Sequence, residues 1–218
     1  MKKLLLLFVG SLFFISCQEI KKETMTTTAP PEHKNEVVEA IKNRRSIRSY
    51  KPEQIDQAQL DTIIDCGINA PSALNKQTWE VRVVQNADLL KRINDSFVEK
   101  AKGKELKGSA ARSQEPGFSV FHGAPTLIIV GREKNNPTSF VDCGLLAQNI
   151  LLSAESMNIG TCTIGNMASI LNDPDAKEFL KEINMPDTHE VAFGIAIGYK
   201  NESPEAKTRD TSKVQYVK

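Results

Sequence analysis

Two separated groups of basic side chains are the first feature of this sequence that could carry chemistry. One is the run RRSIR at residues 44–48, and the other is KTR at residues 207–209. Crowded guanidinium groups repel one another, and the Arg fork and a hydroxyl match the oxygens of a phosphate monoester. Each group alone is more often a solvated surface, so a phosphate site requires that the fold bring both together. The candidate phosphate ligands are Arg44, Arg45, Ser46, Arg48, Lys207 and Arg209.

Two further segments have the composition of a site for a planar ring. In the stretch PSALNKQTW at residues 71–79, Pro71 and Ser72 form a rigid turn, and the amide of Asn75 can both donate and accept hydrogen bonds, as the uracil-like edge of a flavin requires. A helix-terminating turn with a side-chain cap explains the same residues equally well. In the segment TCTIGN at residues 161–166, small residues around Ile164 and Gly165 either let a ring approach the backbone or form a strand and a turn.

The elements that must position these groups are indicated by hydrophobic periodicity. In the first half of the chain the pattern predicts a helix from residue 36 to 41, a second helix behind an N-cap at Asp56 and ending near Gly67, a strand at 79–84 and a helix at 87–101. The Lys-, Gly- and Ser-rich stretch 102–122 is long for a loop in a compact domain. We predict that it is a mobile lid with one short helix.

The second half predicts a buried core with several strands. Residues 126–131 and 191–198 are continuous apolar strands, with glycines in the latter where close backbone approach is needed. Residues 142–157 carry apolar side chains around most of a helix, which predicts either a central helix or one at a dimer interface. A helix at 173–183 and a short strand at 214–217 complete the prediction. The class is therefore α+β, with helices covering a mixed β-sheet.

Composition and charge exclude several other kinds of site. The formal net charge is only +1, so no basic excess points to nucleic acid. Cys66, Cys143 and Cys162 lie far apart without metal-ligand spacing, which favours apolar filler and leaves a single disulfide open. A dedicated acid/base triad is not visible. His122, at the end of the lid, is the histidine to test.

The first residues resemble a bacterial lipoprotein leader. A basic start and an apolar run of about twelve residues fit a signal peptide and are too short for a membrane span. The run ends at the sequence FISC, which resembles a lipobox with Cys17 as the lipidated residue; an ordinary signal peptide cleaved elsewhere is the alternative. We predict a signal peptide at 1–16, a flexible tether at 17–35, a domain at 36–218, and a location in the bacterial cell envelope on a membrane anchor.

Taken in order, these patterns resemble the nitroreductase family across nearly all of residues 36–218. The resemblance implies the nitroreductase fold, an FMN cofactor and a homodimer with the long helix after Asp142 at the interface. It implies that the basic residues of 44–48 and 207–209 hold the FMN phosphate and that Ile164 and Gly165 lie over one face of the ring. It also implies that Pro71, Ser72 and Asn75 contact the ring edge. Thr78 stands where the family often has proline.

The resemblance also implies an activity. FMN would accept a hydride from NAD(P)H and pass two electrons to a nitroaromatic, quinone or similar small acceptor. Export raises the hypothesis that a membrane quinol or a protein is the donor instead. Two alternatives stay open: a membrane-tethered flavin- or substrate-binding lipoprotein without turnover, and a flavin enzyme of the same fold with a different reaction, such as reductive dehalogenation or dehydrogenation of a ring.

Overall fold

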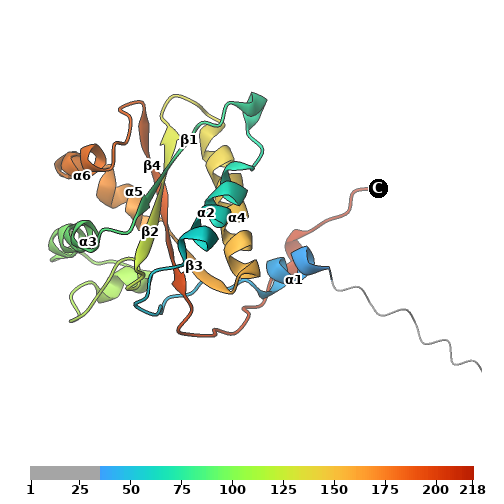
Figure 1. Cartoon of the computed structure of the whole chain (residues 1–218), viewed down its shortest axis with the longest axis horizontal. Helices are drawn as coiled ribbons and strands as arrows, with labels where there is room; N and C mark the ends of the chain where they lie inside the picture. Colours follow the sequence, from blue (N-terminus) through green and yellow to red (C-terminus); the bar gives the residue numbers. More distant parts are fainter. Residues whose placement is uncertain (1–34) are drawn as a thin grey trace, which may run out of the picture. The chain divides into compact units, whose positions relative to one another are not determined.

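The computed structural model describes residues 35–218, so the predictions for the signal peptide, Cys17 and the tether up to residue 34 lie outside the described residues. Within this range a small sheet is flanked by helices (Figure 1). The strands are β1 Trp79–Val84, β2 Thr126–Glu133, β3 Ile159–Ile164 and β4 His189–Tyr199. The α-helices are α1 Glu36–Asn43, α2 Gln57–Ile68, α3 Ala87–Ala101, α4 Ser139–Ser156, α5 Asn166–Leu171 and α6 Lys177–Glu182. Short 3-10 turns are η1 Ala73–Asn75, η2 Gly108–Arg112, η3 Pro174–Ala176 and η4 Thr211–Lys213.

The sheet has the order β1-β2-β4-β3, and every neighbouring pair of these strands is antiparallel. The predicted mixed sheet is therefore wrong for this described part of the chain. Helix α4 does join two strands that run in the same direction, β2 and β3, but β4 lies between them. The chain between β1 and β2 leaves and re-enters the sheet at the same end, because Val84 at the end of β1 pairs with Leu127 near the start of β2.

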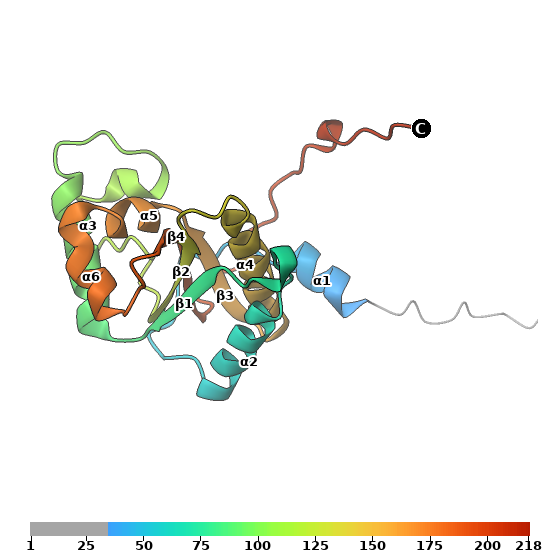
Figure 2. The ribbon, with the colours of Figure 1, turned by 90° about the horizontal axis from the view of Figure 1, so that it is seen from above.

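Helices cover both faces of the sheet. Viewed from above, α3, α5 and α6 lie on one side and α2 and α4 on the other (Figure 2). One apolar cluster fills the space under α3, α5 and α6, and a second lies under α2 and α4. The central strand β2 is buried over residues 126–131, as its uninterrupted apolar sequence predicts. The α+β class is confirmed.

Local capping residues explain where several helices begin. The carboxylate of Asp56 accepts hydrogen bonds from the backbone N–H groups of Ala58 (3.0 Å) and Gln59 (3.3 Å), which confirms the predicted N-cap of α2. Asn86 caps α3 in the same manner through the Leu89 N–H, at 2.9 Å. The predicted bounds of β1 and α3 agree with the structure residue for residue.

Helix α2 ends at Ile68, which confirms the predicted helix end near Gly67, but the structure gives this glycine a further role. It lies inside α2, and a Cβ atom placed on it would be 2.6 Å from Cγ1 of Ile150 on α4. Glycine is needed there because the two helices approach each other closely.

Gly67→Ala is expected to lower the free energy of unfolding by about 1–2 kcal/mol, since Ile150 is buried and cannot move without repacking. Asp65→Ala is the matched control, because it introduces the same residue two positions earlier, on the exposed side of α2. It should change the free energy of unfolding by less than about 0.5 kcal/mol. Urea unfolding of both variants measures the difference. Equal stability of the two would contradict the close helix contact.

The stretch 102–122 contains one short helical turn, η2, as predicted. Its second half packs onto α3: the Phe118 ring stacks on Phe97 with centroids 5.9 Å apart. Asn94 accepts a hydrogen bond from the Val120 N–H at 2.9 Å and donates one to the Phe118 carbonyl at 3.1 Å. The side chain of one residue on α3 therefore fixes the backbone of this stretch. Its mobility stays a prediction.

Two predicted elements in the last part of the chain change form. The helix expected over 173–183 is divided into η3 and α6, with Asp173 capping the first and Pro174 at its start. The strand expected at 214–217 does not form: Val214, Tyr216 and Val217 are exposed, and none of the strands within residues 35–218 pairs with them. None of the helices within 35–218 has the length and apolar content to cross a bilayer.

Candidate functional site

The segment that carries the first basic group is fixed to the edge of the sheet, along β3. Ile47 is 2% exposed, and its N–H donates to the Thr161 carbonyl on β3 at 2.9 Å. The buried Tyr50 hydroxyl donates to the Ile47 carbonyl at 2.7 Å, and burial raises the pKa of Tyr50. Ser46 forms an isolated bridge with Thr161. The apolar residue between the arginines is thus the anchor that orients the polar ones outward.

The chain after β4 folds back over this segment. The Asn201 N–H donates to the Ser49 carbonyl at 3.0 Å, and the Arg48 N–H donates to the Glu202 carboxylate. These contacts bring the second basic group beside the first. Both border one cavity of about 200 Å³, lined by Arg44, Arg45, Ser46, Arg48, Pro204, Glu205, Lys207 and Arg209. The structure therefore brings together all six residues predicted for the phosphate; Glu202, Pro204 and Glu205 had no signal in the sequence.

The basic side chains of this cavity, which we call the cationic cavity, do not have equal roles. Arg45 donates to the carbonyls of Lys42 (2.6 Å) and Arg44 (2.8 Å), so it satisfies the end of α1. The Arg44 guanidinium makes no hydrogen bond to any residue of the described chain. With five basic side chains and one carboxylate, Glu205, at its wall, the cavity has the charge and donor groups that an anion such as a phosphate monoester requires.

The predicted ring-edge residues lie elsewhere in the chain. The Ala73 N–H and the Thr78 hydroxyl both donate to the buried carboxylate of Asp142, at 3.1 and 3.0 Å. Asp142 is in the first turn of α4, whereas the cationic cavity lies near its last turn, where Glu155 pairs with Lys200. These two ends are about 20 Å apart along the helix. Within one chain, Pro71, Ser72 and Asn75 are not brought to the cationic cavity.

The turn at 71–77 is held in an unusual backbone conformation. Leu74, Asn75 and Gln77 have φ angles of 53°, 55° and 49°, in the left-handed region that costs non-glycine residues energy. The Gln77 N–H donates to the Ser72 hydroxyl at 2.9 Å, which closes the turn. The Leu74 side chain is 89% exposed. Strain and an exposed apolar side chain in one turn indicate a surface prepared for contact.

Ile164 and Gly165 lie at the end of β3, the strand that Ser46 meets at Thr161. Ile164 is buried, and no atom lies within 4 Å of where a Cβ on Gly165 would be. Ile164 is three residues beyond Thr161 on the strand, a distance of about 10 Å. A flat group extending from the cationic cavity along β3 therefore reaches open space at Gly165. Neither residue lines the cavity itself.

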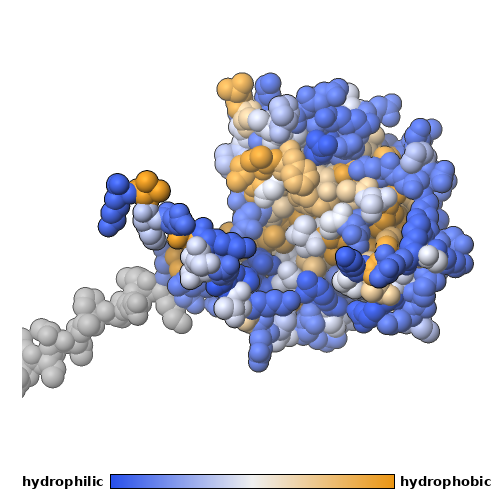
Figure 3. All heavy atoms as spheres, turned by 180° about the vertical axis from the view of Figure 1, so that it is seen from behind, coloured by the Kyte–Doolittle hydropathy of each residue, from blue (hydrophilic) through white to orange (hydrophobic). Residues whose placement is uncertain are grey.

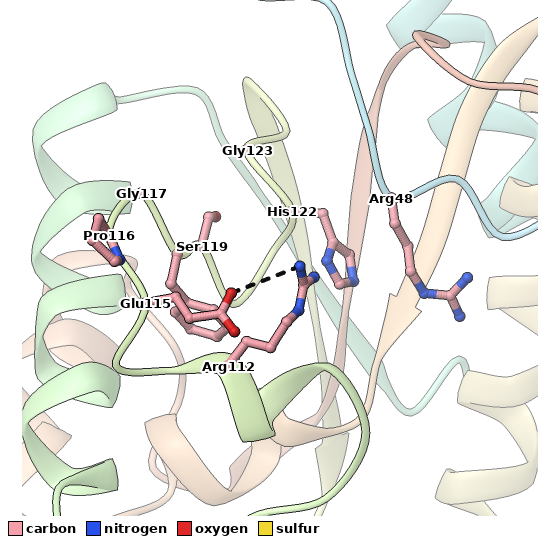
Figure 4. A pocket seen from close by; sticks show the side chains of 9 residues that line it. Arg48, Arg112, Glu115, Pro116, Gly117, Ser119, His122 and Gly123 are labelled. Carbon is pink, nitrogen blue, oxygen red and sulfur yellow. Dashed lines mark ion pairs between the residues drawn. The ribbon is translucent and has the colours of Figure 1, made fainter.

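A second cavity of about 230 Å³ adjoins the first, and Arg48 lines both. Its other walls come from the stretch 102–122 and the turn that follows (Figure 4). We call it the lid cavity; it is lined by Arg48, Arg112, Glu115, Pro116, Gly117, Phe118, Ser119, His122 and Gly123. The sequence marked His122 for testing but gave no signal for Arg112 or Ser119, which lie in a stretch without periodicity.

Comparison with known proteins decides the family. The sequence profile of the nitroreductase family matches residues 41–199. The chain belongs to the nitroreductase family. A nitroreductase of Bacteroides fragilis with bound FMN is 30% identical, with a TM-score of 0.77 covering 84% of this chain and 100% of that one. A nitroreductase of Desulfitobacterium hafniense with bound FMN is 31% identical, with a TM-score of 0.78, covering 84% and 99%. The NADPH-flavin oxidoreductase of Vibrio harveyi is 29% identical over 80% of this chain and 70% of its own.

The cysteines of the described domain of this nitroreductase family member form no disulfide. Cys143 and Cys162 are buried, Cys66 is partly buried, and all three are free thiols in the structure. Burial raises the pKa of Cys143 to about 11, so this thiol stays neutral. The residues of the described part form no cluster of metal-ligating side chains.

His122 gives the nitroreductase domain a specific acid response. Burial, and then the charges of Arg48 and Arg112, lower the pKa of His122 below its usual 6.5. Between the lowered pKa and 6.5 the unfolded chain binds a proton at this ring that the folded chain does not. The free energy of unfolding therefore falls as the pH falls through this window. His122→Gln is expected to reduce that loss, measured as the difference between urea unfolding at pH 8 and at pH 5; an unchanged difference would contradict it.

Proposed function

We propose that this chain is an FMN-dependent oxidoreductase that transfers two electrons from NAD(P)H to a small nitroaromatic, quinone or similar acceptor. The observation that carries the proposal is the cationic cavity, in which basic residues from the two ends of the domain meet around one anion-sized space. Family members of similar sequence bind FMN, and a relative is named as an NADPH-flavin oxidoreductase. A lipoprotein that binds flavin without turnover is not favoured.

The residues of the cationic cavity hold the phosphate end of FMN. Arg44, Arg48, Lys207 and Arg209 supply positive charge, and the Ser46 hydroxyl donates a hydrogen bond. Arg45 supports the site through the end of α1, because its guanidinium already donates to carbonyls there. When bound, FMN supplies the hydride and electron transfer itself. The chain's task is to hold the ring with one face open, along β3 toward Ile164 and Gly165.

The working unit is a homodimer in which each ring site takes residues from both chains. Pro71, Ser72 and Asn75 lie at the far end of α4 from the cationic cavity of their own chain, so they serve the cavity of the partner. A broad apolar area on the face shown in Figure 3 supports this arrangement. Further support comes from large apolar side chains left exposed on α1, on the turn at 71–77, on α4 and in the tail, which are Val37, Val38, Ile41, Leu74, Phe140, Val141, Leu145, Val214, Tyr216 and Val217.

The leader sequence adds a location to this function. Lipidation of Cys17 after removal of residues 1–16 places the domain in the bacterial cell envelope, attached to a membrane. A membrane quinol or a protein donor then becomes an alternative to NAD(P)H, because nicotinamide cofactors are held inside the cell. Detergent partition of the full chain and of Cys17→Ser from the expressing bacterium tests the anchor. Release of Cys17→Ser into the aqueous phase supports it, and identical partition of both contradicts it.

One preparation tests the enzymatic proposal. The full chain, purified in detergent, is expected to be yellow and to release FMN on denaturation. It should oxidise NADH or NADPH when a quinone or a nitroaromatic compound is added. If the chain binds flavin and turns over with a reduced quinol but with neither NADH nor NADPH, the quinol is the electron donor. Protein that stays colourless after incubation with FMN would refute it.

A further inference from the structure

The lid cavity is not needed to hold the phosphate of FMN, yet it has the composition of a second binding site. It is separate from the cationic cavity except at Arg48, which lines both. Its remaining polar side chains come from the stretch 102–122, which sequence patterns left without a role. Arg112 is the last residue of η2, and Ser119 lies in the loop that follows it.

Positive charge dominates this cavity. Arg48 and Arg112 lie on either side of His122, whose ring is drawn between them in Figure 4, and both arginines act on the His122 charge. Glu115 is the carboxylate in the wall, and it meets Arg112 at 4.0 Å with both side chains more than 60% exposed. Such a long, solvated pair is weak, so Arg112 is available to another anion. Glu202 is the remaining acidic group acting on His122, and it already accepts the Arg48 N–H.

A hydroxyl in the same wall lacks a partner. The Ser119 Oγ atom is buried and forms no hydrogen bond with any described residue. A buried polar group without a partner costs free energy, and native structures rarely leave one unsatisfied. Because Ser119 lines the lid cavity, a ligand there that accepts a hydrogen bond satisfies it.

The backbone of the cavity wall is strained at the histidine. His122 and Gly123 have φ angles of 61° and 71°; glycine tolerates this conformation, whereas histidine does so at a cost. The strain holds a half-buried imidazole at the wall of the cavity. A residue kept in such a conformation often marks a binding position, and here it agrees with the charge and with the free hydroxyl.

We propose that the lid cavity binds an oxyanion carried by a substrate, a carboxylate or a phosphate, through Arg112, the Ser119 hydroxyl and His122, with Arg48 completing the positive field. The inference rests on the proposed function, because Arg48 joins this cavity to the cofactor phosphate site and so places the anion beside the flavin. Two molecules of the reaction can bring such a group. One is an acceptor with a carboxylate on its aromatic ring, and the other is the extra phosphate that distinguishes NADPH from NADH.

Paired probes that differ in the anion test the inference on the full chain. 4-Nitrobenzoate is compared with its neutral amide, 4-nitrobenzamide, and NADPH with NADH. In Arg112→Gln the KM of one anionic probe is expected to rise about tenfold relative to its partner, as loss of a charge-assisted hydrogen bond implies. Lys107→Gln is the matched control, since it removes the same charge beside the same short helix from an exposed residue outside the cavity; both ratios should stay within about twofold of the parent chain.

Equilibrium binding supplies a readout independent of turnover. Calorimetry of the FMN-loaded chain with benzoate, NADPH and NADH is expected to show selective weakening of an anion in Arg112→Gln, and a smaller weakening in Ser119→Ala. An effect confined to the carboxylates identifies the acceptor as the source, and one confined to NADPH identifies the donor. Unchanged ratios and unchanged binding of all anions would overturn the inference. Loss of turnover with every probe while anion binding stays selective would instead contradict the proposed function.

Discussion

Replacing Arg44 by Glu is expected to weaken FMN binding by at least about a hundredfold, because it removes one charge-assisted hydrogen bond and adds a repulsive charge at the phosphate. Arg44 is the residue of choice since its guanidinium forms no hydrogen bond with another described side chain or backbone group, and α1 ends at Asn43 just before it. The substitution therefore changes the cationic cavity without breaking an internal contact. Quenching of free FMN fluorescence by the flavin-free chain measures the dissociation constant.

Lys42→Glu is the control for long-range charge. It makes the same change two residues earlier on an exposed position of α1, outside the cationic cavity. Its FMN affinity should stay within about threefold of the parent chain, because a solvated charge at that distance is screened by salt. If Arg44→Glu and Lys42→Glu weaken FMN equally, the phosphate is held by the general field of the surface. If neither does, the phosphate lies elsewhere.

Local sequence signals predicted the elements with notable accuracy where one physical cause dominated. The strand 79–84 has an alternating pattern and the helix 87–101 an amphipathic one, and Asn86 caps the start of the helix. Asp56 was recognisable as a cap because its carboxylate needs only the N–H groups of the next two or three residues. Such contacts are contained within a few neighbouring residues, so the sequence alone suffices for them.

Features that depend on distant partners were not predictable in this way. The strand direction in the sheet depends on β4 lying between β2 and β3, which no local pattern records. Gly67 marked the end of α2 correctly, but its close contact with Ile150, far along the chain, had no signal in the sequence. The apolar residues at 214–217 have strand composition but pair with none of the four described strands. In each case the feature depends on a contact with a distant part of the chain, which a local pattern does not contain.

Some residues of the candidate site were likewise predictable from the sequence, and others were not. The basic residues of 44–48 and 207–209 line one cavity, as predicted, and crowding them is easier when an anion lies among them. The resemblance to the nitroreductase family supplied the turn at 71–77, but the sequence gives no indication that this turn lies at the opposite end of α4. Arg112 and Ser119 came from the structure alone, since a loop without periodicity hides which side chains share a cavity.

Complementation between two impaired variants is expected if the ring site is shared between chains. Asn75→Gly keeps the left-handed backbone, because glycine adopts a φ of 55° without strain, and removes only the amide; turnover is expected to fall at least about tenfold. Arg44→Glu is impaired at the phosphate. In a mixed dimer one site carries both changes and the other carries neither. Equal amounts of the two chains, exchanged freely, should then recover about a quarter of the parent turnover.

The recovery separates a shared site from a site built within one chain. If Asn75 and Arg44 of the same chain served one ring, every site in a mixed dimer would carry one change, and turnover would remain at the level of the impaired parents. Mixing Arg44→Glu with Arg209→Glu is the matched control, since both residues line the same cationic cavity. In that mixed dimer each site carries one of the two changes, so neither site is unchanged. Each chain contributes its own Arg44 and Arg209 to one cavity, so no recovery is expected from that pair, whereas Asn75→Gly and Arg44→Glu must restore each other for the shared ring site to stand.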